Sequence, residues 1–130
     1  MRMIINIDVP ELQPAITFYT AALGLDLHRI LDDDVAELVG ASSVIYLLAK
    51  KSESITSTSS QEVRRYSRHW TPVHIDFVVD NLDEAVKRAI DAGAIQESEH
   101  AEWRGSKCIT FADPFGHGFC LIEFLEETYS

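Results

Sequence analysis

Residues 4–12 read Ile-Ile-Asn-Ile-Asp-Val-Pro-Glu-Leu, and residues 74–82 read His-Ile-Asp-Phe-Val-Val-Asp-Asn-Leu, so that the two stretches align without a gap. Each runs into a segment of helical periodicity that ends near a glycine, Gly24 in the first case and Gly93 in the second. The sequence therefore predicts one structural unit used twice. Each copy must bury its apolar face, and the nearest surface available is the other copy. We expect the functional surface to lie where the two copies face each other.

The first unit reads as a strand, a helix and three further strands. Residues 3–9 alternate between apolar and polar positions, which is the period of a half-buried strand, and Pro10 ends it. Apolar residues then recur at helical spacing from Glu11 to Gly24. Three short apolar-rich runs follow, and we predict them to form an antiparallel meander over 25–31, 35–39 and 44–49.

The second unit repeats this order after a linker. Residues 51–71 are rich in serine and threonine and have no core-forming periodicity, so we predict a mobile linker or lid, with a short helical turn over 62–70. The strand and the helix that follow are expected over 73–79 and 82–92, and the last three strands over 94–101, 107–111 and 119–124. The predicted fold class is α+β. Two βαβββ units form a curved sheet around a cleft within a single domain, 1–130, whose units span 1–50 and 72–130.

Composition narrows the partners of the chain. Its 130 residues are 46% hydrophobic and carry a formal net charge of −10, which argues against binding to nucleic acid or to an anionic membrane surface. The charge is compatible with a cationic ligand, although a solvated acidic surface is the simpler explanation. No apolar stretch approaches the roughly 20 residues of a membrane span. Cys108 and Cys120 lie in apolar runs, as buried reduced thiols of a cytoplasmic protein do.

Two motifs add a resemblance to a known family. The segment Phe18-Tyr19-Thr20-Ala21-Ala22-Leu23-Gly24-Leu25 lies in the first unit, and Asp113-Pro114-Phe115-Gly116-His117 precedes a strand ending in Leu121-Ile122-Glu123-Phe124. Together they resemble the vicinal oxygen chelate superfamily, which includes glyoxalase I, extradiol dioxygenases, fosfomycin-modifying enzymes and bleomycin-resistance proteins. The resemblance implies a cup of eight strands around a ligand, usually with a divalent metal at its floor. It does not specify the reaction.

The resemblance also implies positions for metal ligands at the start of the first strand and the end of the last strand of each unit. In the second unit these positions hold His74 and Glu123. In the first unit they hold Ile4 and Leu48, and neither side chain is a metal ligand. An ion such as Zn, Ni, Fe or Mn would then be held weakly unless water, substrate or another residue completed its coordination. His74 beside Glu123 is equally consistent with a histidine–carboxylate pair that holds no metal.

Strand alternation predicts which other side chains face the cup. If Ile75 and Phe77 face the helix, His74 and Asp76 face the cup, and Asp76 is the best third oxygen donor. Leu121 is predicted to face the cup as well. Trp103 is expected either as a stacking wall of the cup or as part of its rim. The predicted ligand-binding residues are Ile4, Asn6, Tyr46, Leu48, Trp103 and Phe119.

These features favour a protein that binds a small metabolite or antibiotic in the cup, either without metal or with a weakly held one. The alternative is a metal-dependent enzyme of the same superfamily: a glyoxalase-like lyase or isomerase, a thiol transferase or a ring-cleaving dioxygenase. In that case His74 and Glu123 would hold the ion, and Glu123 or Asp76 would act as the catalytic base. We further expect a homodimer, because each unit leaves an open sheet face and an exposed edge.

Overall fold

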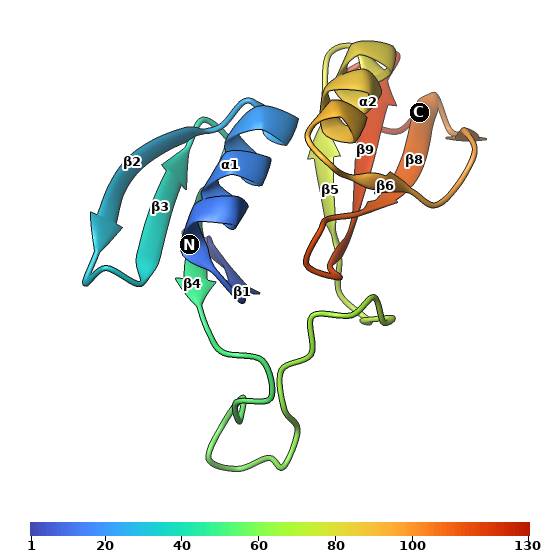
Figure 1. Ribbon diagram of the computed structural model, residues 1–130. Helices are drawn as coiled ribbons and strands as arrows, with labels where there is room; N and C mark the ends of the chain where they lie inside the picture. The colour runs from blue at the N-terminus through green and yellow to red at the C-terminus, as the bar shows by residue number, and fades with distance from the viewer. The chain divides into compact units, whose positions relative to one another are not determined.

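The computed structural model describes the whole chain, residues 1–130, as two compact units that cover 1–67 and 68–130 (Figure 1). Each unit contains one helix and one mixed sheet, with four strands in the first unit and five in the second. The predicted α+β class of repeated strand–helix–strand units is confirmed. Neither helix has the length and apolar character needed to span a membrane.

The sheet of unit 1 has the strand order β1-β4-β3-β2, in which β1 and β4 are parallel and the other neighbours antiparallel. Ala36, Leu38, Ile45 and Leu47 are fully buried on one face of this sheet and pack with α1. The helix ends at Gly24, whose φ of 66° is a left-handed conformation that glycine adopts without strain. The elements are β1 (Ile4–Val9), α1 (Leu12–Leu23), β2 (Asp26–Leu31), β3 (Val35–Val39) and β4 (Val44–Ala49).

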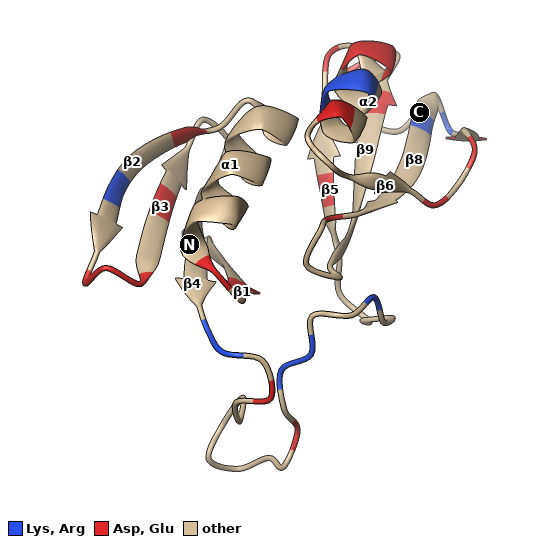
Figure 2. Ribbon diagram, viewed as in Figure 1, with Lys and Arg blue, Asp and Glu red and all other residues tan.

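The sheet of unit 2 repeats this arrangement, with the order β5-β9-β8-β6, parallel pairing of β5 with β9, and β7 as a further neighbour of β8. Asn81 caps α2 by accepting a hydrogen bond from the backbone N–H of Glu84. Figure 2 shows that α2 carries charges of both signs, whereas α1 carries none. The elements are β5 (Ile75–Val78), α2 (Leu82–Asp91), β6 (Ile95–Gln96), β7 (Ala101–Trp103), β8 (Ser106–Ala112) and β9 (Gly118–Phe124).

One predicted strand is divided in two. Residues 94–101 were predicted as continuous, but the structure has the short β6 and a separate β7. The interruption arises at Ser98, because its hydroxyl oxygen accepts the backbone N–H of Thr110 in place of a carbonyl oxygen. A side chain that bonds the neighbouring strand in this way breaks the regular ladder.

The serine- and threonine-rich segment is attached to unit 1, and the predicted helical turn over 62–70 is wrong. Ile55 and Val63 form an isolated antiparallel bridge instead. Arg64 then donates from Nε to Asp8 Oδ2 at 2.6 Å, and the hydroxyl of Tyr66 donates to the carbonyl oxygen of Lys50 at 2.6 Å. These bonds anchor an otherwise polar segment to β1 and to the residue that follows β4. Its predicted mobility stays a prediction.

The register of β9 places Phe119 and Leu121 on the opposite face of the sheet from the one that strand alternation predicted. The predicted role of Phe119 in ligand binding stays a prediction. Asp76 lies level with Cys120, and Phe77 lies level with Leu121. Level residues of parallel neighbours share a face, so Phe119 and Leu121 lie with Phe77 on the face covered by α2. Phe119 stacks on Phe111 with 5.6 Å between ring centroids and meets Phe77 edge-on at 5.9 Å. Phe119 is therefore a core residue.

Replacing Phe119 with alanine should lower the free energy of unfolding by about 3–5 kcal/mol, the usual cost of removing a buried aromatic ring. Urea denaturation followed by circular dichroism measures this. As the matched control, Leu125→Ala should change stability by less than about 0.5 kcal/mol, because that side chain is 85% exposed. A Phe119→Ala variant as stable as the parent protein would contradict the core assignment.

Candidate functional site

Three potential metal ligands converge in unit 2. His74 immediately precedes β5, Asp76 lies on β5, and Cys120 lies beside Asp76 on β9. Their ligand atoms all lie within 4.8 Å of one another, and His74 Nε2 is 3.1 Å from Asp76 Oδ1. His74 and Asp76 are exposed and Cys120 is buried. The parallel pairing of β5 with β9 creates this cluster, because it sets the start of both strands side by side.

Two thiols occupy the face of the sheet that α2 does not cover. We call this the helix-free face of unit 2, and its sheet residues are Asp76, Val78, Cys108, Thr110, Cys120 and Ile122. The Thr110 hydroxyl lies 3.6 Å from Cys120 Sγ. Burial raises the pKa of Cys108 to about 12 and also raises the pKa of Cys120. Both side chains are therefore protonated thiols at neutral pH.

A pocket of about 160 Å³ opens at this cluster. Trp70, which is 80% exposed, forms part of its wall beside His74 and Cys120. Arg68 is held there by a bidentate ion pair in which its Nε and Nη2 donate to Glu97 at 2.8 and 2.9 Å. The complete lining is Arg68, Trp70, Thr71, His74, Thr110, Gly118, Phe119 and Cys120.

Gly118 allows the arginine to lie across the start of β9. A Cβ atom at this position would be only 2.5 Å from Arg68 Nη2, so any larger residue would displace the guanidinium. The pocket thus combines a fixed cation, an indole ring, an imidazole and a thiol. Such a mixture of apolar surface with a few convergent polar groups is typical of small-molecule sites.

The structure does not bring Glu123 to His74, so the predicted pair is not formed. Glu123 lies near the opposite end of β9, because Ile75 is level with Phe119 at the start of that strand. Its Oε1 accepts the backbone N–H of Leu82, the first residue of α2, at 3.2 Å. A carboxylate there stabilises the positive end of the helix. The residue level with Asp76 on β9 is Cys120 rather than the predicted glutamate.

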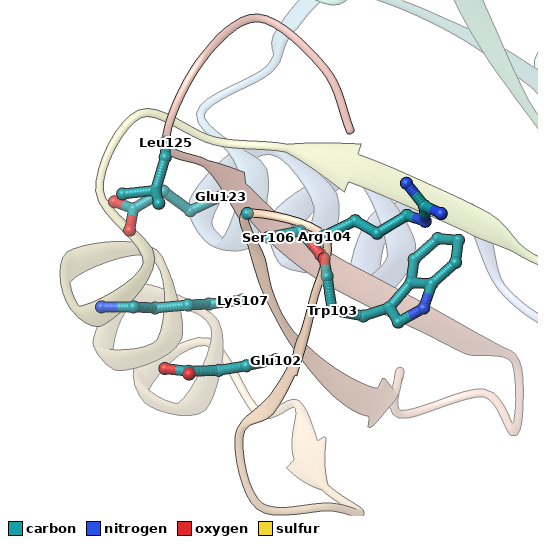
Figure 3. Close-up of a pocket in the computed structure, with 8 residues that line it drawn as sticks. Glu102, Trp103, Arg104, Ser106, Lys107, Glu123 and Leu125 are labelled. Atoms are coloured by element: carbon teal, nitrogen blue, oxygen red, sulfur yellow. The ribbon is translucent and has the colours of Figure 1, made fainter. Parts of the chain in front are cut away.

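Glu123 instead borders a second and larger pocket, of about 320 Å³, around the β7–β8 hairpin (Figure 3). Trp103 also lies there, and not at the His74 pocket. Its ring contacts Tyr129 at 5.0 Å, and the Arg104 guanidinium lies 5.6 Å from the ring centroid. Figure 3 shows Trp103 and Arg104 pointing to one side of the hairpin and Lys107 to the other. Because its lining side chains point in different directions, they cannot all contact one group of a ligand.

Unit 1 has different residues at the equivalent positions. On the face not covered by α1, Asn6 lies level with Tyr46, as Asp76 lies level with Cys120 in unit 2. Ile4 and Tyr46 therefore stand where His74 and Cys120 stand, and the sequence superposition that placed Leu48 at a ligand position was wrong by one residue. Ile4 remains half exposed. The predicted roles of Ile4, Asn6, Tyr46 and Leu48 in ligand binding stay predictions.

A polar cluster that the sequence analysis missed surrounds Glu37 on this face. Glu37 is only 5% exposed, and its carboxylate accepts hydrogen bonds from the Tyr46 hydroxyl at 2.6 Å and from Arg29 Nε and Nη2 at 3.2 Å each. It also bonds His28 Nδ1. A register shift between Leu27 and Arg29 marks a β-bulge, which turns His28 and Arg29 toward the same carboxylate.

Hydrogen bonding controls the ionisation of this cluster. The bonds from Tyr46, His28 and Arg29 favour the charged carboxylate and lower the pKa of Glu37 from 4.5 to about 2. The same bond raises the pKa of Tyr46. Sequence alone gave no signal for this arrangement, because neither the bulge nor the burial of Glu37 is encoded in a local pattern.

A family model described as a glyoxalase-like domain matches residues 4–122. The chain belongs to the glyoxalase-like domain family. It is thus a member of the vicinal oxygen chelate superfamily, as the motifs around Gly24 and Gly116 predicted. Comparison with curated protein sequences finds no match.

Three solved structures illustrate the similarity of fold. The fosfomycin resistance protein FosX from Listeria monocytogenes has 20% sequence identity and a TM-score of 0.70, covering 98% of this chain and 95% of that one. Lactoylglutathione lyase from Agrobacterium tumefaciens has 19% identity and a TM-score of 0.65, covering 95% and 92%. A glyoxalase/bleomycin resistance protein/dioxygenase family enzyme from Burkholderia phytofirmans has 18% identity and a TM-score of 0.73, covering 94% and 97%.

The donor set of this chain suits zinc better than the other ions that the resemblance implies. His74, Asp76 and Cys120 provide one nitrogen, one oxygen and one sulfur. Zinc commonly binds three such protein ligands and keeps a fourth position for water or substrate. The equivalent positions of unit 1 hold an aliphatic side chain and a tyrosine whose hydroxyl is bonded to Glu37, so unit 1 does not repeat this donor set. The predicted metal and catalytic roles of His74 and Asp76 stay predictions, with Cys120 in place of Glu123.

The Glu37 cluster should make the free energy of unfolding depend on pH between about 4.5 and 2. Glu37 binds a proton more weakly when folded, so its contribution to the free energy of unfolding is complete above pH 4.5 and is lost as the pH falls toward 2. Urea midpoints measured across this range should fall less steeply for Glu37→Gln than for the parent. Glu99→Gln, which changes an exposed carboxyl outside the cluster, should keep the parent's steepness. Equal steepness for all three proteins would contradict the assignment.

Proposed function

We propose that this glyoxalase-like protein binds a small metabolite or antibiotic at the His74 pocket of unit 2, and that it holds a metal weakly or not at all. The observation that carries the proposal is the convergence of Trp70, Arg68 and His74 on one pocket. Its volume of about 160 Å³ is below that of pockets that enclose whole drug-sized molecules. It suits a small metabolite or one group of a larger ligand.

The state of the donors supports weak metal binding. The Cys120 thiol must lose its proton before it can act as a strong ligand, and burial raises its pKa. His74 is already paired with Asp76. Metal binding therefore competes with the proton on Cys120 and with the contact between His74 and Asp76, which makes the affinity low at neutral pH and higher in base.

A metal-dependent enzyme of the same superfamily is the alternative, and the 4.8 Å clustering of three donors favours it. His74, Asp76 and Cys120 would hold the ion, which would supply Lewis-acid polarisation of a substrate oxygen. Glu123 would not act as the base in this case, because it is bonded to the first turn of α2. The candidate reactions remain those of a lyase or isomerase, a thiol transferase or a ring-cleaving dioxygenase.

Ligand binding with metal removed tests the proposal. A library of small metabolites and antibiotics can be screened by isothermal titration calorimetry with EDTA present. The screen should identify a ligand whose affinity falls about tenfold in Trp70→Ala, because the stacking of a flat or apolar group on an indole ring is worth about 1–3 kcal/mol. Trp103→Ala is the matched control and should bind like the parent, since Trp103 lies at the other pocket.

Zinc titration against a competing chelator distinguishes the alternative. The proposal predicts that zinc binding is weak or absent. Any weak binding should be abolished by His74→Ala and by Cys120→Ala and left unchanged by Glu123→Gln. Zinc that survives purification through EDTA, together with ligand binding only after zinc is added, would overturn the binding proposal and support the metal-dependent enzyme.

We also propose that the chain forms a homodimer. β1 and β2 are the edge strands of the unit 1 sheet, and Leu27 and Ile30 on β2 are each 41% exposed. An edge strand presents unpaired backbone N–H and C=O groups that can pair with another chain. Sedimentation at micromolar concentration should show a species of twice the 14.6 kDa chain mass. A monomer alone would contradict this proposal.

A further inference from the structure

The buried Glu37 carboxylate of unit 1 accepts more hydrogen bonds than its burial alone requires. Arg29 and Tyr46 already give the buried carboxylate three hydrogen bonds. His28 adds a fourth, and the β-bulge in β2 is the backbone change that turns this residue toward Glu37. Bulges are often found next to functional sites, where they redirect a side chain.

The protonation of His28 follows from its partner. Because the pKa of Glu37 is about 2, this group is a carboxylate at neutral pH and can only accept hydrogen bonds. The Nδ1 atom of His28 that bonds it must therefore carry a proton. In the neutral imidazole the lone pair is then on Nε2. The side chain of His28 is 61% exposed, so this atom is accessible to a ligand.

A cationic group is held by the same carboxylate as His28. Arg29 uses Nε and Nη2 to hold Glu37, whereas its Nη1 takes no part in that pair, and the side chain is 57% exposed. Its remaining N–H groups are donors suited to an oxygen that gains negative charge. The Glu37 carboxylate thus holds both a potential base, His28, and a potential partner for an oxyanion, Arg29.

We propose that His28 is a general base that removes a proton from carbon in a small-molecule substrate, with Glu37 as its positioning residue and Arg29 as the partner of the oxyanion that forms. Nε2 takes the proton, and the C–H electron pair forms a new π bond as a neighbouring π or σ pair moves onto oxygen. In a carbonyl substrate the product is an enolate. The imidazolium then returns the proton to the same or an adjacent carbon, so no co-reactant is needed. This activity goes beyond the proposed binding function and does not involve His74.

A carboxylate that holds one imidazole nitrogen fixes the ring and stabilises the imidazolium formed when the other nitrogen takes a proton. Positioned general bases of this kind contribute about 10²–10⁴-fold to a rate. The other partners of Glu37 make it a rigid support, because Tyr46 and Arg29 prevent the carboxylate from rotating away from His28.

The base elimination of 5-nitrobenzisoxazole provides a probe that requires no knowledge of the natural substrate. In that reaction the base removes the carbon-bound proton, the C–H pair forms the nitrile, the N–O bond breaks and the phenolate oxygen takes the charge. With EDTA present, the parent protein should react about tenfold or more faster than His28→Ala. Glu37→Gln should lose most of the rate difference between the parent and His28→Ala. His100→Ala, which removes another exposed histidine, should match the parent.

A spectroscopic measurement distinguishes a role of Glu37 in positioning His28 from a role in folding alone. Nitrogen NMR of the parent at a pH where imidazoles are neutral should show His28 with its proton on Nδ1, and Glu37→Gln should shift the population toward the Nε2–H form. Circular dichroism confirms that each variant is folded, and Tyr46→Phe serves as a milder perturbation of the carboxylate if Glu37→Gln does not fold. The proposal is overturned if the parent carries the proton on Nε2, or if His28→Ala reacts as fast as the parent.

Discussion

The parallel pairing of the first and last strand in each unit is the constraint on which the rest of the structure depends. It sets Asn6 level with Tyr46 and Asp76 level with Cys120, and it decides which side chains lie on the face without a helix. A shift of one residue would exchange the two faces of β9 and put Phe119 where Cys120 stands. The core and the candidate site are therefore determined by the same hydrogen-bond register.

The two units use this common frame for different chemistry. In unit 2 the row across the sheet consists of Asp76, Cys120 and Thr110, next to His74. In unit 1 the corresponding row is Asn6, Tyr46, Glu37 and Arg29. The first row offers donors for a soft metal ion or a polar ligand. The second row contains the ionised carboxylate of Glu37, which is stabilised by the hydrogen bonds that it accepts from Tyr46, Arg29 and His28.

Burial raises the pKa of the acidic groups in both units, but the net pKa shifts are opposite. Around Glu37 it is outweighed by hydrogen bonds to the charged form, so the pKa falls. At Cys108 and Cys120 burial is the largest influence, so the thiols keep their protons. This contrast explains why unit 1 carries a charged carboxylate on the sheet face that α1 does not cover, whereas the two thiols of unit 2 stay neutral.

The sequence by itself determined the repeat, the order of strands and helices, the family and the presence of His74 and Asp76 at the candidate site. Periodicity shows these features because alternation and helical spacing are local. It did not show the register of β9, since Phe119, Cys120, Leu121 and Ile122 are all apolar and all buried, and a run without alternation has no preferred face. Only the tertiary structure decided that Cys120 replaces Glu123 beside Asp76, and that a bulge brings His28 and Arg29 to Glu37. Both depend on pairing between strands that are distant in sequence, where hydrogen-bond geometry and side-chain volume set the alignment.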